Sequence, residues 1–121
     1  MSDTLLFPCS HGPEAPERAT GPHIAAATAA ASGQPTIVIC TIEAVWLGLP
    51  ERAATVEDPA MPPLIDLQQR LVAAGGEIWL CSACTTKRFI TGDTPLVSGA
   101  TIVGAATIVE ALTQGRSITL A

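Results

Sequence analysis

Residues 36–42, Thr-Ile-Val-Ile-Cys-Thr-Ile, form an apolar run rich in β-branched side chains, with no charged residue and no glycine or proline. β-branched residues favour extended backbone. A strand that is apolar on both of its alternating faces is typical of the centre of a parallel sheet, where helices cover both sides. We therefore expect this stretch to be a central strand, and it sets the fold class for the rest of the chain.

Alternating strands and helices are expected on both sides of that strand. Apolar runs predict further strands at 4–7, where Pro8 should end the run, and at 77–81, 100–103 and 117–120. Helical spacing or alanine richness predicts helices at 16–32, 63–74 and 105–112, with a short one near 84–89. Residues 43–61 are expected to form a long, partly mobile connection with one helical turn at 44–49.

This alternation predicts an α/β fold. Parallel strands joined by right-handed helical crossovers give a three-layer α/β/α sandwich with a mostly parallel, five-stranded sheet. The length of 121 residues fits a single domain, and we assign residues 1–121 to it.

The composition limits the classes of partner. Hydrophobic residues make up 48 % of the chain and charged residues only 14 %, which predicts a surface buried between subunits. The net charge is −5, and the basic residues are scattered apart from the adjacent Lys87 and Arg88. Nucleic-acid binding is therefore not expected.

The start of the chain carries no recognisable secretion signal, and residues 24–31 are too short to cross a bilayer. We therefore expect a cytoplasmic protein with no membrane contact. In reducing cytosol, four cysteines are more plausible as free thiols, metal ligands or redox groups than as structural disulfides.

Three cysteines stand at the predicted carboxyl ends of strands, which is the edge where open α/β sheets bind ligands. They are Cys9, Cys40 and Cys81. The apolar run around Cys40 favours a core position for its side chain. For Cys9, which borders a loop, a core role and a functional role are equally open.

The strongest functional signal is the CxxC sequence Cys81-Ser-Ala-Cys84 at a predicted strand-to-helix turn. Helix amides at such a turn favour thiolate over thiol. Lys87 and Arg88 follow on the next turn, where positive charge would lower a cysteine pKa and attract an anionic sulfur donor. Two ordinary core or cap cysteines, or metal ligands, are the alternative interpretations.

The histidines and the remaining cysteines add weaker signals. Cys9 and His11 could join the other cysteines around a metal, but a single CxxC without a second pair does not predict a metal site. His11, in the loop beside Cys9, could assist proton transfer. His23 is expected to be a packing or surface residue.

Residues 11–14, His-Gly-Pro-Glu, precede a helix and could bind a small anion, although no nucleotide-binding pattern is present. Of the two tryptophans, Trp79 is expected in the core. Trp46 could equally cap a pocket or a subunit contact.

At this point the layout resembles the DsrE/DsrF-like family across nearly the whole chain. The resemblance rests on four features: the opening strand with Gly12-Pro13-Glu14 and Pro16-Glu-Arg-Ala19, the small-residue helix ending at Gly33, residues 71–84, Leu-Val-Ala-Ala-Gly-Gly-Glu-Ile-Trp-Leu-Cys-Ser-Ala-Cys, and residues 97–105, Val-Ser-Gly-Ala-Thr-Ile-Val-Gly-Ala. Family members often follow the cysteine with a basic residue and then glycine. Here Lys87 and Arg88 fit that pattern, but Phe89 replaces the glycine.

The resemblance implies a trimeric or hexameric assembly and a sulfur-relay function. Cys81 would carry the persulfide and Cys84 would be a second thiol, with sulfur donor and acceptor proteins as partners and no cofactor. Two other interpretations remain open: a non-enzymatic module that binds a metal or small ligand in an oligomeric pocket, and an assembly subunit with inert cysteines.

Overall fold

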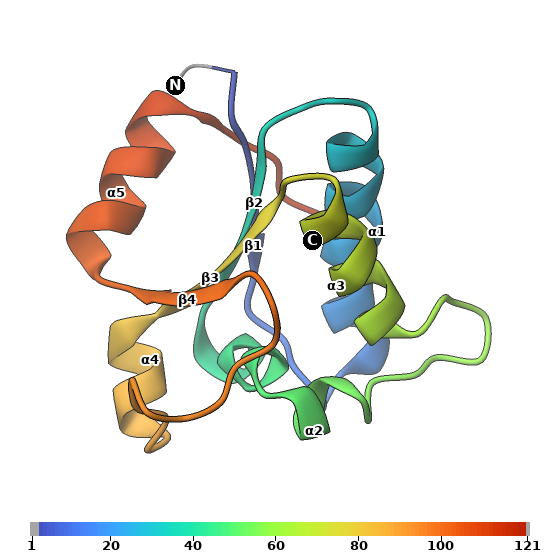
Figure 1. The fold of residues 1–121 in the computed structure, drawn as a ribbon, viewed down its shortest axis with the longest axis vertical. Coiled ribbons are helices and arrows are strands. Elements are labelled where there is room, and N and C mark those ends of the chain that lie inside the picture. The colour runs from blue at the N-terminus through green and yellow to red at the C-terminus, as the bar shows by residue number, and fades with distance from the viewer. Residues whose placement is uncertain (1–2, 121) are drawn as a thin grey trace.

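The fold is an α/β sandwich built on one five-stranded, all-parallel sheet, as the sequence predicted (Figure 1). The computed structural model describes residues 3–120. The strands follow the order β4-β3-β2-β1-β5 across the sheet. Their bounds are β1 Leu5–Cys9, β2 Thr36–Cys40, β3 Glu77–Cys81, β4 Ala100–Val103 and β5 Arg116–Ser117.

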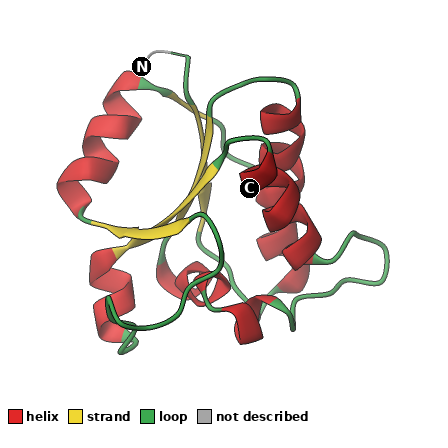
Figure 2. Ribbon diagram, in the orientation of Figure 1, coloured by secondary structure: helices red, strands yellow, loops and turns green. Residues whose placement is uncertain are grey.

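Helices cover the two faces of the sheet unequally (Figure 2). α1 (Pro16–Ala31) and α3 (Leu64–Ala73) pack side by side on one face. α5 (Ala105–Gln114) lies on the opposite face. The short helix α4 (Ser82–Lys87) stands at the carboxyl end of β3. Within residues 3–120 no helix combines the length and the apolar character that crossing a membrane requires.

β2 is the central strand that its sequence predicted. All five of its residues are buried, since helices lie over both faces. Its neighbours align with it in register, so that Cys40 lies opposite Cys9 of β1 and opposite Leu80 of β3. The main hydrophobic cluster lies on the α1 and α3 side, and a smaller cluster forms under α5 around Leu6, Ile37, Ile39 and Ile108.

The expectation that Pro8 ends the first strand was wrong. β1 continues one residue beyond it. On the β2 side the Leu5 N–H donates to Pro35 O, while on the β5 side the Ile118 N–H donates to Leu6 O. Because bonding direction alternates along a strand, Pro8 faces β5, where its missing N–H costs the central pairing nothing. The final strand is shorter than expected: β5 covers Arg116–Ser117, whereas the sequence predicted a strand at 117–120.

The segment expected to be a long connection contains more regular structure than predicted. It forms a 3₁₀ helix, η1 (Ile42–Gly48), followed by a short helix, α2 (Pro50–Ala53). The sequence predicts only one helical turn here, because its prolines are typical of a loop. Apolar side chains anchor the segment to the core: Ala44, Val45, Leu47, Leu49, Ala53 and Val56 are buried.

Glycines end the two long helices on one face, as predicted. Gly33 after α1 and Gly75 after α3 have φ angles of +91° and +93°. At the end of α3, the Gly76 N–H donates to Leu71 O and the Gly75 N–H donates to Val72 O. This is the Schellman arrangement, in which the left-handed residue allows the last carbonyls to be satisfied.

Candidate functional site

The cysteines gather at the carboxyl edge of the sheet, as the sequence predicted. Cys9, Cys40 and Cys81 are the last residues of β1, β2 and β3, and Cys84 lies one turn into α4. All four are free thiols. Their surroundings divide them into two pairs of different chemical character.

Cys9 and Cys40 form the buried pair. They lie opposite each other in the β1–β2 register, and their exposed fractions are 3 % and 0 %. Burial raises the pKa of the Cys9 thiol to about 11 and raises the pKa of Cys40 well above its ordinary value. The Cys9 Sγ lies 3.4 Å from the His11 backbone O, to which it donates a weak hydrogen bond. Both groups are therefore protonated thiols at neutral pH.

Cys81 is partly exposed at the point where β3 becomes α4. It occupies the cap position of α4, but its side chain makes no capping hydrogen bond. The residue packs at the border of the smaller cluster, together with Trp79, Val103 and Ala111. The Cys81 side chain is thus not buried in the main core, and its sulfur forms no hydrogen bond with a backbone group within the described residues.

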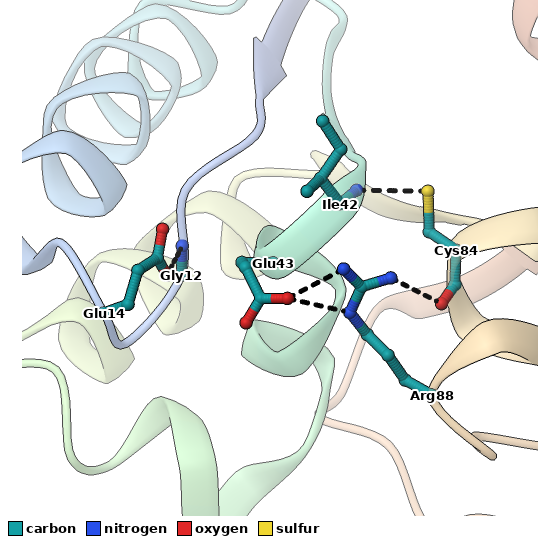
Figure 3. Close-up of polar contacts among 6 residues, drawn as sticks. All are labelled: Gly12, Glu14, Ile42, Glu43, Cys84 and Arg88. Carbon is teal, nitrogen blue, oxygen red and sulfur yellow. Dashed lines mark hydrogen bonds and ion pairs between the residues drawn. The ribbon is translucent and has the colours of Figure 1, made fainter.

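Cys84 is also partly exposed, and its sulfur accepts a backbone hydrogen bond (Figure 3). The Ile42 N–H donates to Cys84 Sγ at 3.1 Å. Ile42 has a φ angle of +54°, which is unusual for a β-branched residue. The left-handed backbone at Ile42 thus belongs to the contact between the start of η1 and α4. Cys84 packs against the main cluster, so the two thiols of the CxxC sequence have different neighbours.

Arg88 lies where the sequence suggested, but its charge is directed to a carboxylate (Figure 3). Its Nη2 and Nε donate to Glu43 Oε2 at 2.7 and 3.1 Å, and its Nη1 donates to the Cys84 backbone O at 3.1 Å. The guanidinium therefore fastens α4 to η1. Lys87 on the same helix is exposed. Sequence reasoning did not single out Glu43, because no local pattern links it to a residue 45 positions later.

Phe89 adopts the left-handed backbone conformation that a glycine would adopt at the end of α4. Its φ angle is +60°, and its side chain is 90 % exposed. The Phe89 N–H donates to Thr86 O, and the Ile90 N–H donates to Thr85 O. These bonds repeat the Schellman arrangement at the end of α4. The replacement of glycine thus leaves the backbone turn in place.

The loop after β1 holds His11 and packs against η1. His11 Nδ1 lies 3.4 Å from Ser10 Oγ. The amide expected to be available for an anion is already occupied, since the Gly12 N–H donates to Glu14 Oε1 at 2.8 Å (Figure 3). A side chain at Gly12 would collide with the backbone O of Glu43, so the loop packs closely on η1.

Of the two positions expected for His23, packing or surface, the structure shows the packing one, since the residue is buried. Its Nδ1 lies 2.8 Å from Ala19 O, and burial lowers its pKa to about 4. Trp79 is only partly buried, in contrast to its expected core position, and its Nε1 donates to Glu77 Oε1 at 3.1 Å. The other tryptophan, Trp46, stacks with Arg52, whose guanidinium carbon lies 4.2 Å from the ring centre.

Metal ligands do not converge in the part of the chain that the structure describes. No group of three or more His, Cys, Asp or Glu side chains is placed there to hold an ion. The cysteines and His11, considered as ligands in the sequence, are divided between the buried pair, the exposed pair and the first loop.

Comparison with known proteins gives a family match and a structural match. The profile of the DsrE/DsrF-like family matches residues 3–120. A crystal structure of the YchN protein from E. coli superposes with a TM-score of 0.80, covering 99 % of this chain and 100 % of that one, at 19 % sequence identity. Such a likeness concerns the fold. No curated protein matches the sequence.

Proposed function

Because this chain belongs to the DsrE/DsrF-like family, we propose that it is a sulfur carrier that holds sulfane sulfur as a persulfide on Cys81. Membership in this family links the chain to sulfur relay. A donor protein would supply the sulfur and an acceptor protein or thiol would receive it.

The observation that carries this proposal is the contrast between the two cysteine pairs. Cys9 and Cys40 are buried, with raised pKa values, and a protonated thiol is a poor nucleophile. Cys81 and Cys84 are partly exposed at the carboxyl edge of the sheet. Sulfur transfer between proteins needs a thiolate that a second protein can reach, which favours the CxxC pair.

The proposed transfer is a thiolate exchange at sulfur. The Cys81 thiolate attacks the outer sulfur of a donor persulfide, forming a new S–S bond while the donor S–S bond breaks and the donor leaves as its thiolate. In the second step an acceptor thiolate attacks that outer sulfur and Cys81 leaves as thiolate. No electrons are gained or lost overall, so this route requires no cofactor.

Cys84 offers a second outcome. If its thiolate attacks the Cys81 sulfur, a Cys81–Cys84 disulfide forms and hydrosulfide leaves. An external dithiol must then reduce the disulfide. The Ile42 N–H donates to Cys84 Sγ and holds that sulfur at the start of α4, three residues after Cys81. Arg88 holds α4 in place through Glu43. Lys87 is exposed on α4 and forms no ion pair within residues 3–120, so it would meet an anionic donor.

We also propose that copies of the chain assemble into a trimer or hexamer and that they work in the cytoplasm. The α5 face supports an assembly, because its single helix leaves apolar side chains in solvent. Val109 and Leu112 of α5 are 57 % and 39 % exposed. Sedimentation of the purified protein tests the assembly: a monomer at all concentrations would contradict it.

Intact-mass spectrometry after exposure to a persulfide donor tests the carrier role. We expect an adduct of about 32 Da, the mass of one sulfur atom, that a reductant removes. The adduct should vanish in a Cys81→Ser variant and persist in a Cys9→Ala variant. An undiminished adduct in Cys81→Ser would reject the assignment of Cys81.

A further inference from the structure

A second candidate site lies at the other end of the carboxyl edge, between β1 and β5. β2, β3 and β4 extend from one side of β1, whereas β5 lies on the other side. After β4 the chain therefore crosses back over the sheet and places β5 beside β1, so the order of the strands reverses between β1 and β5. In open α/β sheets, ligands bind in the crevice outside the carboxyl ends of the strands at this kind of switch point.

A cavity of about 300 Å³ occupies this crevice. Its volume falls at the lower end of the range for small-molecule sites. Polar groups line it from four segments: Ser10 and His11 after β1, Arg18 of α1, Thr41 after β2, and Thr119 after β5. The side chains of Pro8, Pro22 and Leu120 form its apolar walls.

The electrostatics of the cavity favour an anion. Among residues 3–120, Arg18 is the one charged residue that lines it, and none of the lining side chains in that range is a carboxylate. Within residues 3–120, Arg18 forms no ion pair, although Glu17, Glu57 and Asp58 share a shallower depression on its other side. Hydroxyl groups of Ser10, Thr41 and Thr119 can donate to an oxygen ligand.

Cys9 also lines the cavity, as a neutral thiol. It is 3 % exposed, and its thiol makes only long hydrogen bonds of 3.4 and 3.9 Å to backbone oxygens. A protonated thiol adds no negative charge that would repel an anion. It also cannot act as the nucleophile of a transfer reaction, so the cavity is suited to binding and not to sulfur exchange.

We propose that this cavity binds a small organic oxyanion, a sulfonate or phosphate monoester with a short apolar group. The Arg18 guanidinium and the surrounding hydroxyls would hold the charged head, and the proline and leucine walls would cover the apolar group. The site is distinct from Cys81, because β2 separates the ends of β1 and β3, and two strand spacings amount to about 10 Å. The proposal stands whether or not Cys81 carries sulfur.

Matched ligands test the need for charge. Propane-1-sulfonate, propyl phosphate and inorganic sulfate would each be titrated into isotope-labelled protein, with the neutral methyl propyl sulfone as the control of similar shape. We expect saturable amide shifts at Ser10, His11 and Thr41 from one or both organic anions, and which of the two binds more tightly identifies the head group. Equal shifts from the sulfone, or no saturable shift from any anion, would overturn the proposal.

Matched variants test the role of Arg18. Arg18→Gln and Arg70→Gln remove the same charge, but Arg70 is exposed on α3 and does not line the cavity. We expect Arg18→Gln to weaken binding by about tenfold or more, the effect of losing one charge-assisted contact, and Arg70→Gln to leave it nearly unchanged. Thr119→Val, at an exposed position, gives a second variant that leaves the core intact. Equal weakening by both arginine variants would show only general charge attraction and would reject the site.

Discussion

Phe89 occupies a backbone position that glycine fills at the ends of α1 and α3. The three residues that follow a helix cap in this conformation are Gly33, Gly75 and Phe89, with φ angles of +91°, +93° and +60°. For a residue with a side chain, left-handed backbone costs roughly 1–2 kcal/mol. Since the ring is 90 % exposed, burial offsets little of this cost.

We therefore expect Phe89→Gly to stabilise the fold. The relief of backbone strain is reduced by the greater freedom of glycine in the unfolded chain, roughly 0.5–1 kcal/mol, which leaves a net gain of about 0.5–1 kcal/mol. Phe89→Ala is the matched control, because it removes the ring but keeps a Cβ in the left-handed conformation. Its free energy of unfolding should stay within about 0.5 kcal/mol of the parent protein.

Urea unfolding at one fixed protein concentration measures both variants. With a urea dependence of about 2 kcal/mol/M, the expected gain moves the Phe89→Gly midpoint upward by about 0.3–0.5 M. Fixing the concentration matters because assembly would also shift the midpoint. If glycine leaves the midpoint unchanged or lowers it while alanine is neutral, the strain assigned to Phe89 is wrong.

Burial holds the pKa of His23 at about 4 instead of 6.5, so its unfolded form binds a proton first as the pH falls. The free energy of unfolding should be highest above pH 6.5 and should fall by on the order of 3 kcal/mol as the pH drops towards 4. Urea midpoints measured across this range would show the loss, and a His23→Leu variant should lack it. In the ion pair of Glu43 and Arg88, the Glu43 side chain is 40 % exposed, so solvent weakens the attraction. A double-mutant cycle with Glu43→Gln and Arg88→Gln should therefore give a coupling free energy of only about 0.5–1 kcal/mol. A coupling of zero would mean that the pair does not fasten α4. Mapped iodoacetamide labelling near pH 8 should modify the CxxC pair before Cys9 and Cys40, and urea should abolish the difference; fast native labelling of Cys40 would refute its burial.

The fold followed from the sequence because its signals are local and repeated. The apolar β-branched run of β2 and the glycines after α1 and α3 each predict one element, and the parallel connections then allow few arrangements. Two of the errors, at the end of β1 and in residues 43–61, came from proline. Pro8 predicts the end of a strand, but whether a missing N–H matters depends on which neighbour it faces, and that is a property of the assembled sheet.

The candidate site was predictable in position but not in electrostatics. The ends of strands located the cysteines, since parallel strands bring their carboxyl ends to one edge. The pairing of Arg88 with Glu43 and the hydrogen bond from Ile42 to Cys84 join residues more than 40 positions apart. No short pattern records such contacts. The cavity between β1 and β5 was hidden for the same reason, because its lining comes from four separate segments.

The location of the first transferred sulfur tests the central claim most directly. The unmodified protein would react with less than one equivalent of a persulfide donor, be trapped with an alkylating agent, and be digested for peptide mapping of all four cysteines. We predict that the added sulfur is found on the peptide carrying Cys81. Its appearance on Cys9 or Cys40, or on Cys84 before Cys81, would contradict the account.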